Sequence, residues 1–109
     1  MSDTIKVLGQ LAAAAATEED LYTVTNLAQT TCSTLVICNR TASVVTFRVS
    51  VSVNDAATAT KDYLFYDTAI AGNTTVTATL GITLGQNDTM RTYVSATGLS
   101  FNLFGVETL

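Results

Sequence analysis

The chain contains no histidine, no proline and no tryptophan, and only 13% of its residues are charged. The lack of histidine removes the commonest general base and metal ligand, and with it the Ser-His-Asp and Cys-His arrangements of nucleophilic catalysis. The five basic residues are scattered, so there is no basic stripe that neutralises several phosphates. We therefore expect a protein that is not an enzyme and that binds neither nucleic acid nor a membrane surface.

Acidic residues are the remaining candidates for catalysis. A two-carboxylate site of the glycosidase type needs two close acids, and Asp62 with Asp67 or Glu18 with Asp20 are the pairs that sequence spacing offers. No acid lies in an apolar context that raises a carboxyl pKa. We interpret these residues as solvated loop charges.

Two Asn-Asp pairs carry oxygens of the kind that Ca²⁺ accepts, Asn54–Asp55 and Asn87–Asp88. Each pair is short and lacks the repeated acidic spacing of a calcium-binding loop. Asn and Asp are favoured in turns because their side chains bond to the nearby backbone and tolerate unusual dihedral angles. We predict two turns here, and neither a metal nor a cofactor.

The two cysteines, Cys32 and Cys38, lie in one predicted strand. Six residues of strand span ~20 Å, far more than the roughly 5.5 Å between the Cα atoms of a disulfide. We predict two free thiols, which suits folding in a reducing cytosol.

No apolar run approaches the ~20 residues that span a bilayer. The segment from Lys6 to Ala16 has one cation and many small residues, as a weak signal peptide does, but Gly9 and Gln10 interrupt it. We expect no export by this route.

Length and composition indicate one folded β domain. A chain of 109 residues is the size of a single domain, so we expect one domain over residues 1–109. Threonine makes up about a fifth of the chain and 48% of residues are hydrophobic, a composition that favours half-buried strands over helices or disorder.

Alternation of apolar and polar residues predicts about eight short strands separated by turns. The expected strands are Ile5–Gln10, Leu21–Thr25, Cys32–Cys38, Val45–Val53, Lys61–Asp67, Val76–Leu84, Met90–Ala96 and Leu99–Phe104. Residues 12–20 are expected to form a surface connection that contains a helical turn. This pattern predicts an all-β fold, either an antiparallel β-sandwich or a jelly roll.

Two local features add detail. The turn-like Arg40–Ser43 between two strongly alternating segments predicts a hairpin of Cys32–Cys38 with Val45–Val53. Gly81, inside the clearest strand, predicts a β-bulge or the close approach of another group.

Aromatic residues suggest a contact surface. Tyr63, Phe65 and Tyr66 put aromatic groups on both faces of one strand, and Phe104 lies on the face opposite Phe101. Core packing accounts for one face of each strand, but the other face needs cover from a second layer. Exposed aromatic patches usually mark interfaces, so these five residues are the predicted subunit interface, with a sugar-stacking platform as the alternative.

The order of several short segments resembles small virion proteins of tailed bacteriophages, notably those of cyanobacteria. The segments that carry the resemblance are IKVLGQ (5–10), LYTV (21–24), CNR (38–40), YLFYD (63–67), TLGITL (79–84) and SFNLFGVE (100–107). The resemblance spans nearly the whole chain.

This resemblance implies a β-sandwich that is part of a virion and is made in the host cytoplasm. The favoured role is a capsid decoration or cement protein, a homo-oligomer with a trimer favoured, which contacts other virion proteins such as the major capsid protein. A tail, neck or fibre module that contributes to attachment or glycan binding is the alternative, and an independent carbohydrate-binding module is a third possibility.

Overall fold

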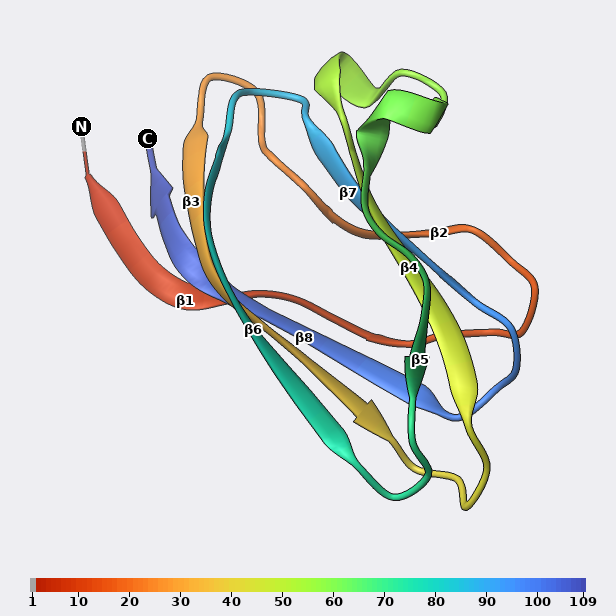
Figure 1. Ribbon diagram of the computed structural model, residues 1–109. Coiled ribbons are helices and arrows are strands. Elements are labelled where there is room, and N and C mark those ends of the chain that lie inside the picture. The colour runs from red at the N-terminus through yellow and green to blue at the C-terminus, as the bar shows by residue number, and fades with distance from the viewer. Residues whose placement is uncertain (1) are drawn as a thin grey trace.

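The computed structural model describes residues 2–109 and contains two four-stranded antiparallel sheets packed face to face (Figure 1). Sheet A has the strand order β1-β8-β3-β6 and sheet B the order β2-β7-β4-β5. Only β4 and β5 are neighbours both in sequence and in a sheet, which is the strand order of a jelly roll. The all-β sandwich of about eight strands predicted from the sequence is therefore confirmed.

The strands are β1 (Asp3–Ala12), β2 (Glu19–Thr23), β3 (Gln29–Asn39), β4 (Val45–Ser52), β5 (Tyr63–Ile70), β6 (Thr75–Leu84), β7 (Thr89–Val94) and β8 (Leu99–Thr108). Two short 3₁₀ turns, η1 (Val53–Asp55) and η2 (Thr60–Asp62), lie between β4 and β5.

The core lies between the two sheets and follows from the period of two in each strand. Phe47 of β4 is fully buried, with its ring 5.6 Å from that of Phe65 and 6.2 Å from that of Phe101. Phe101 and Leu103 of β8 face inward and Phe104 faces outward, so Phe101 and Phe104 lie on opposite faces, as the sequence predicts. Full burial of one such side chain contributes about 1.5–3 kcal/mol.

The predicted hairpin of Cys32–Cys38 with Val45–Val53 is wrong. These segments are β3 and β4, and they lie in different sheets, so the connection between them crosses the sandwich. β3 instead pairs with β8 and β6, and β4 pairs with β7 and β5. Alternation predicts that a segment is a strand, but it does not specify the partner.

Several strand ends also differ from the prediction. β3 and β8 pair with each other as far as Gln29 and Thr108, so both are longer than predicted. Lys61 belongs to η2 rather than to β5, and β5 continues to Ile70. The bulge at Gly81 is confirmed: this residue has φ +59°, and the register between β3 and β6 shifts beside it.

Asn39 joins the two sheets at one end of the sandwich. Its side chain is fully buried at the end of β3, and Nδ2 donates to the carbonyl oxygens of Ser43 (2.8 Å), Ile70 (3.1 Å) and Ala71 (3.2 Å). Oδ1 accepts from the backbone N–H of Thr41 at 3.0 Å. One amide group thus satisfies backbone groups of two of the connections that cross between the sheets at this end, β3–β4 and β5–β6.

The two long sides of the sandwich differ. On one side β1 and β2 approach so closely that a Cβ at Gly9 would overlap the carbonyl oxygen of Leu21. On the other side β5 and β6 end separate sheets and do not pair. One side is therefore closed by backbone contact and the other is not.

We expect Asn39→Ala to lower the free energy of unfolding by about 2–4 kcal/mol, because buried carbonyl oxygens lose their donor. Ser43→Ala is the matched control: its backbone carbonyl is retained, so a change within about 0.5 kcal/mol is expected. Urea denaturation followed by circular dichroism measures both. Equal stability of the two variants would show that Asn39 does not join the sheets.

Candidate binding surfaces

Charge is unevenly distributed between the two sheets. The strands of sheet A contain only Asp3, Lys6 and Glu107 among the five basic and nine acidic residues of the chain. All three lie near the termini, where the Lys6 Nζ is 3.4 Å from Glu107 Oε1. The rest of the outer face of sheet A carries uncharged side chains, many of them threonine.

The ends of β1 and β8 form an exposed apolar ribbon, which we call the terminal ribbon (residues 3–7 and 104–108). Ile5 pairs with Val106, and Val7 pairs with Phe104. Ile5 is 86% exposed, Val7 45% and Phe104 36%. A contiguous apolar surface of this kind is typical of a contact with another protein.

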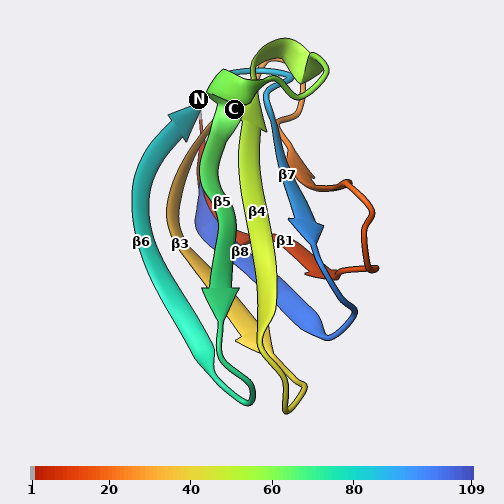
Figure 2. The same ribbon diagram turned by 45° about the vertical axis from the view of Figure 1, so that its right-hand side comes forward.

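β6 is an edge strand without charge. The other edge strands of the described chain each carry charged residues: Asp3 and Lys6 in β1, Glu19 and Asp20 in β2, and Asp67 in β5. Charged residues on an edge prevent pairing with another chain. Of the devices that block such pairing, β6 has only the bulge at Gly81. Figure 2 shows this strand at the margin of the molecule with no strand beyond it.

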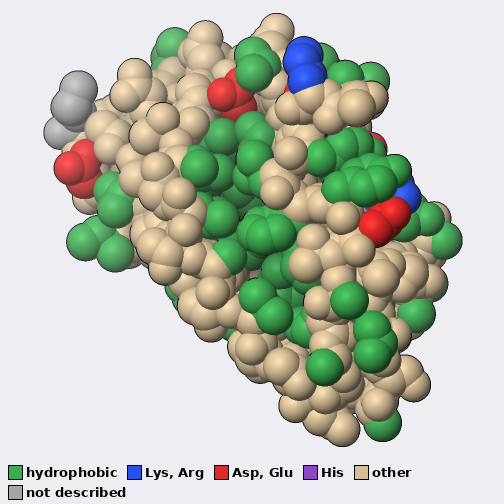
Figure 3. Space-filling view, viewed as in Figure 1, with side chains coloured by type: hydrophobic (Ala, Val, Ile, Leu, Met, Phe, Trp, Pro, Cys, Tyr) green, Lys and Arg blue, Asp and Glu red, His purple; other side chains and the backbone are tan. Residues whose placement is uncertain are grey.

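The core is partly exposed beside this edge. Figure 3 shows hydrophobic side chains gathered in a band between the two sheets. The inward-facing residues of β6 remain half-buried, as does Phe65 of β5; those of β6 are Val76, Ala78, Leu80 and Ile82. We call this edge with its half-buried residues the β6 side.

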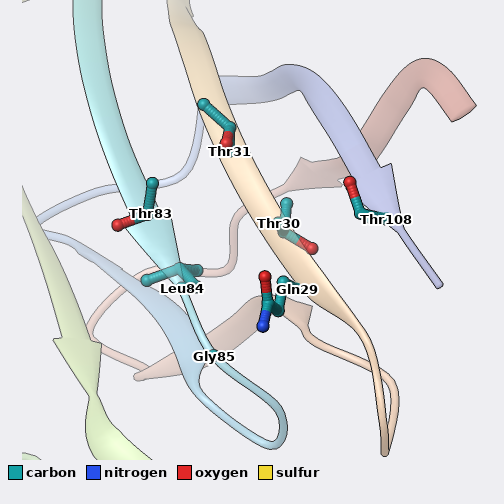
Figure 4. Close-up of a pocket in the computed structure, with 7 residues that line it drawn as sticks. All are labelled: Gln29, Thr30, Thr31, Thr83, Leu84, Gly85 and Thr108. Atoms are coloured by element: carbon teal, nitrogen blue, oxygen red, sulfur yellow. The ribbon is translucent and has the colours of Figure 1, made fainter. Parts of the chain in front are cut away.

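A hollow of about 260 Å³ lies near the C-terminal end of β6. Figure 4 shows that Gln29, Thr30 and Thr31 of β3 line it together with Thr83, Leu84 and Gly85, and with Thr108 of β8. None of these lining side chains is charged or aromatic, so the hollow extends the uncharged surface of sheet A.

Sheet B presents an ordered cluster of tyrosines around Arg48. The Arg48 guanidinium carbon lies 4.3 Å from the ring centroid of Tyr66 and 4.7 Å from that of Tyr93. Asp67 accepts hydrogen bonds from Nε at 2.6 Å and Nη2 at 3.3 Å. This hydrogen bonding lowers the pKa of Asp67 and raises that of Arg48, so both groups stay charged.

The loop between β4 and β5 is fixed by Arg91 of β7. This side chain donates to the Ala56 carbonyl oxygen at 2.7 Å, to Thr58 Oγ1 at 3.1 Å and to Asp55 Oδ1 at 2.8 Å. Asp62 accepts from the backbone N–H of Ala59 at 2.9 Å. The loop is therefore held at several points.

A second hollow, of about 410 Å³, opens where this loop meets β5. Its lining consists of Thr58, Ala59, Thr60, Tyr63 and Tyr66. We call it the tyrosine hollow. The sequence pattern singles out both tyrosines, but it contains no signal for the threonines, which reach this site only through the fold of the loop.

The residues predicted as one interface do not form one surface. Tyr63 and Tyr66 lie together on sheet B, with ring centroids 4.8 Å apart, and Phe104 lies on sheet A. Phe65 is half-buried against the core. Phe101 is 0% exposed and contacts Phe47, so its inclusion in a surface is wrong.

Three of the four acids weighed above as catalytic pairs form ion pairs with basic side chains. Asp62 accepts from Lys61 Nζ at 2.8 Å, and this hydrogen bond lowers its pKa. Asp67 is bound to Arg48, and Asp20 accepts from Arg91 Nε at 3.0 Å. Each of these three acids is thus paired with a cation.

The turn role of the Asn-Asp pairs is confirmed. Asn54, Asp55 and Asn87 have positive φ angles. Asp88 accepts from the backbone N–H groups of Asn54 at 2.9 Å and Gly85 at 2.8 Å, which joins the two turns. Within residues 2–109, no group of three or more acidic or cysteine side chains is arranged to hold a metal ion.

Residues 2–109 include no helix that is long and apolar enough to cross a membrane.

Comparison with known proteins gives a structural likeness. No protein-family model matches the chain, and no curated protein matches it. A chain in the structure of infectious bursal disease virus, Gt strain, is similar to it, with a TM-score of 0.50 and 10% sequence identity. The match covers 96% of this chain and 31% of that one.

At 10% identity the likeness concerns the fold alone. What the two chains share is β-structure of a kind that occurs in a virus. That virus is not a tailed bacteriophage, so the more specific phage assignment stays a prediction. The chain corresponds to about a third of the length of the viral chain.

Both cysteines are free thiols, as predicted, and they differ in accessibility. Cys32 is 0% exposed and burial raises its pKa to about 11, whereas Cys38 is half-buried on the outer face of sheet A. We expect a disulfide reagent such as Ellman's to label Cys38 in the folded chain and Cys32 only after unfolding. Labelling of the Cys32→Ala and Cys38→Ala variants measures the reaction rate of each remaining thiol separately.

The same burial makes stability fall at alkaline pH. The ordinary pKa of an exposed cysteine thiol is 9.0, so above this pH the unfolded chain releases a proton from Cys32 that the folded chain keeps until about pH 11. The free energy of unfolding should fall across this window, and the fall should be smaller in Cys32→Ala than in Cys38→Ala. Equal slopes in both variants would contradict this assignment.

Proposed function

We propose that this chain is a non-enzymatic structural protein of a virion, a capsid decoration or cement protein that self-associates through the β6 side. The observation that carries the proposal is that β6, alone among the edge strands of the described chain, lacks charge and lies beside half-buried apolar residues. The jelly-roll fold and its likeness to a viral structure support a role in a particle.

A second copy of the chain is the partner that best fits this edge. An uncharged strand meets no like-charge repulsion when it pairs with its own copy, and the pairing satisfies its free N–H and C=O groups. The bulge at Gly81 confines regular pairing to the residues before it, Thr75–Leu80. Pairing of β6 with any other edge would meet charged residues, so β6–β6 contacts and an even copy number are favoured over a trimer.

The terminal ribbon is then free to contact a different virion protein, such as the major capsid protein. Ile5, Val7 and Phe104 supply an apolar centre on the outer face. Lys6 and Glu107 lie on the opposite face of the same strands, where Glu107 Oε2 accepts from the Tyr22 hydroxyl at 3.2 Å, so no charge interrupts the apolar surface.

Light scattering on the purified protein tests self-association. We expect an even-numbered oligomer for the native chain and a monomer for Thr77→Lys, which places a charge on β6. Thr31→Lys is the matched control, because Thr31 lies on the same face of sheet A but on the inner strand β3. A native monomer would overturn the self-association, and dissociation by both variants would place the contact on the sheet face instead.

Co-sedimentation with virus particles assembled without this protein tests the decoration role. The native chain should pellet with the particles and Ile5→Lys should not, with at least a tenfold loss of affinity for removal of a central apolar contact. Leu27→Lys is the control, because Leu27 is 80% exposed but lies in the loop between β2 and β3. A native protein that stays in solution would favour a tail, neck or fibre location.

A further inference from the structure

The tyrosine hollow has the size of a small-molecule site and a lining unlike that of the other surfaces. Its volume of about 410 Å³ falls within the range of roughly 300–1,000 Å³ for ligand pockets. Two tyrosines from β5 form one wall and three small residues of the preceding loop form the other. Aromatic surface and hydroxyl groups are thus brought together in one concavity.

The aromatic wall is rigid before any ligand arrives. Tyr66 is 57% exposed, yet Arg48 lies 4.3 Å from its ring centroid and Tyr63 meets it edge-on with centroids 4.8 Å apart. Asp67 holds the guanidinium in place at 2.6 Å. A side chain fixed in this way loses little conformational entropy on binding.

The loop wall is rigid as well. Arg91 donates to the Ala56 carbonyl oxygen and to Thr58 Oγ1, and the Asp62 carboxylate accepts from the Ala59 N–H. The hydroxyl groups of this wall are therefore presented from a fixed backbone.

The electrostatics of the hollow favour a neutral ligand. No acidic or basic residue lines it. The cations around it are already paired: Arg48 with Asp67, Lys61 with Asp62, and Arg91 with Asp20 and Asp55. A phosphate or carboxylate ligand would find no free positive charge, and a metal ion would find no carboxylate ligand.

We infer that the tyrosine hollow binds a neutral sugar ring. A pyranose has an apolar C–H face that packs on an aromatic ring and a rim of hydroxyl groups that exchange hydrogen bonds with threonine and tyrosine hydroxyls. The site lies on sheet B and its loop, whereas the proposed assembly contacts lie on the β6 edge and the terminal ribbon of sheet A. The two functions are therefore separable by mutation.

Saturation-transfer NMR with the methyl α-glycosides of glucose, galactose and mannose tests this site. We expect transfer from the native protein to the ring protons of at least one of them, and about a tenfold weaker affinity for Tyr66→Ala. Tyr93→Ala is the matched control, because Tyr93 also contacts Arg48 but does not line the hollow, and it should bind as the native chain does.

Backbone amide shifts provide a second readout that does not depend on a variant. Titration should move the signals of Ala59, Thr60 and Tyr63 and leave those of β1 and β8 unchanged. No transfer to any of the three glycosides, or equal binding by Tyr66→Ala and the native chain, would overturn the inference. Light scattering on Tyr66→Ala keeps this result apart from the assembly proposal, since its oligomer should match that of the native chain.

Discussion

The structure depends on one topological constraint: every connection except that between β4 and β5 leads from one sheet to the other. Each crossing takes the backbone past the end of the core, where its polar groups cannot all find partners in a sheet ladder. Buried carbonyl and N–H groups must still be paired, because each unpaired group costs about 1–3 kcal/mol. Asn39 meets this requirement for two crossings at once, with its amide group between the β3–β4 and β5–β6 connections.

This constraint also explains which parts of the fold the sequence predicts. Alternation in segments such as Val45–Val53 depends only on which face is buried, so strand positions can be predicted from local sequence, as can the placement of Phe101 and Phe104 on opposite faces. Which of the two faces is buried is not local information, and the prediction that Phe101 lies on a surface is wrong. The partner of each strand depends on contacts between residues far apart in the chain, which no local pattern encodes. Asn39 illustrates the limit, since a buried asparagine at a sheet junction and an exposed one in a hairpin turn have the same local sequence.

The candidate surfaces could be predicted from the sequence to different degrees, because local patterns do not specify which strands are neighbours. Tyr63 and Tyr66 are recognisable from an unusual run of aromatic residues, and their position on one side of β5 follows from the irregular register of that strand. The absence of charge from β6 is visible in the sequence, but it acquires meaning only once β6 is known to be an edge. On the inner strand β3, the same lack of charge requires no explanation.

The exceptional connection between β4 and β5 accounts for the position of the tyrosine hollow. Since both strands lie in sheet B, this loop has no sandwich to cross, and its residues 53–62 make it longer than any other connection in the described chain. It is free to project and to form turns with positive φ at Asn54 and Asp55. Arg91, on the inner strand β7, then fixes the projecting loop by hydrogen bonds to Ala56 and Asp55. A rigid sheet that holds a long loop is a common origin of binding sites, because the scaffold supplies the order that the loop lacks.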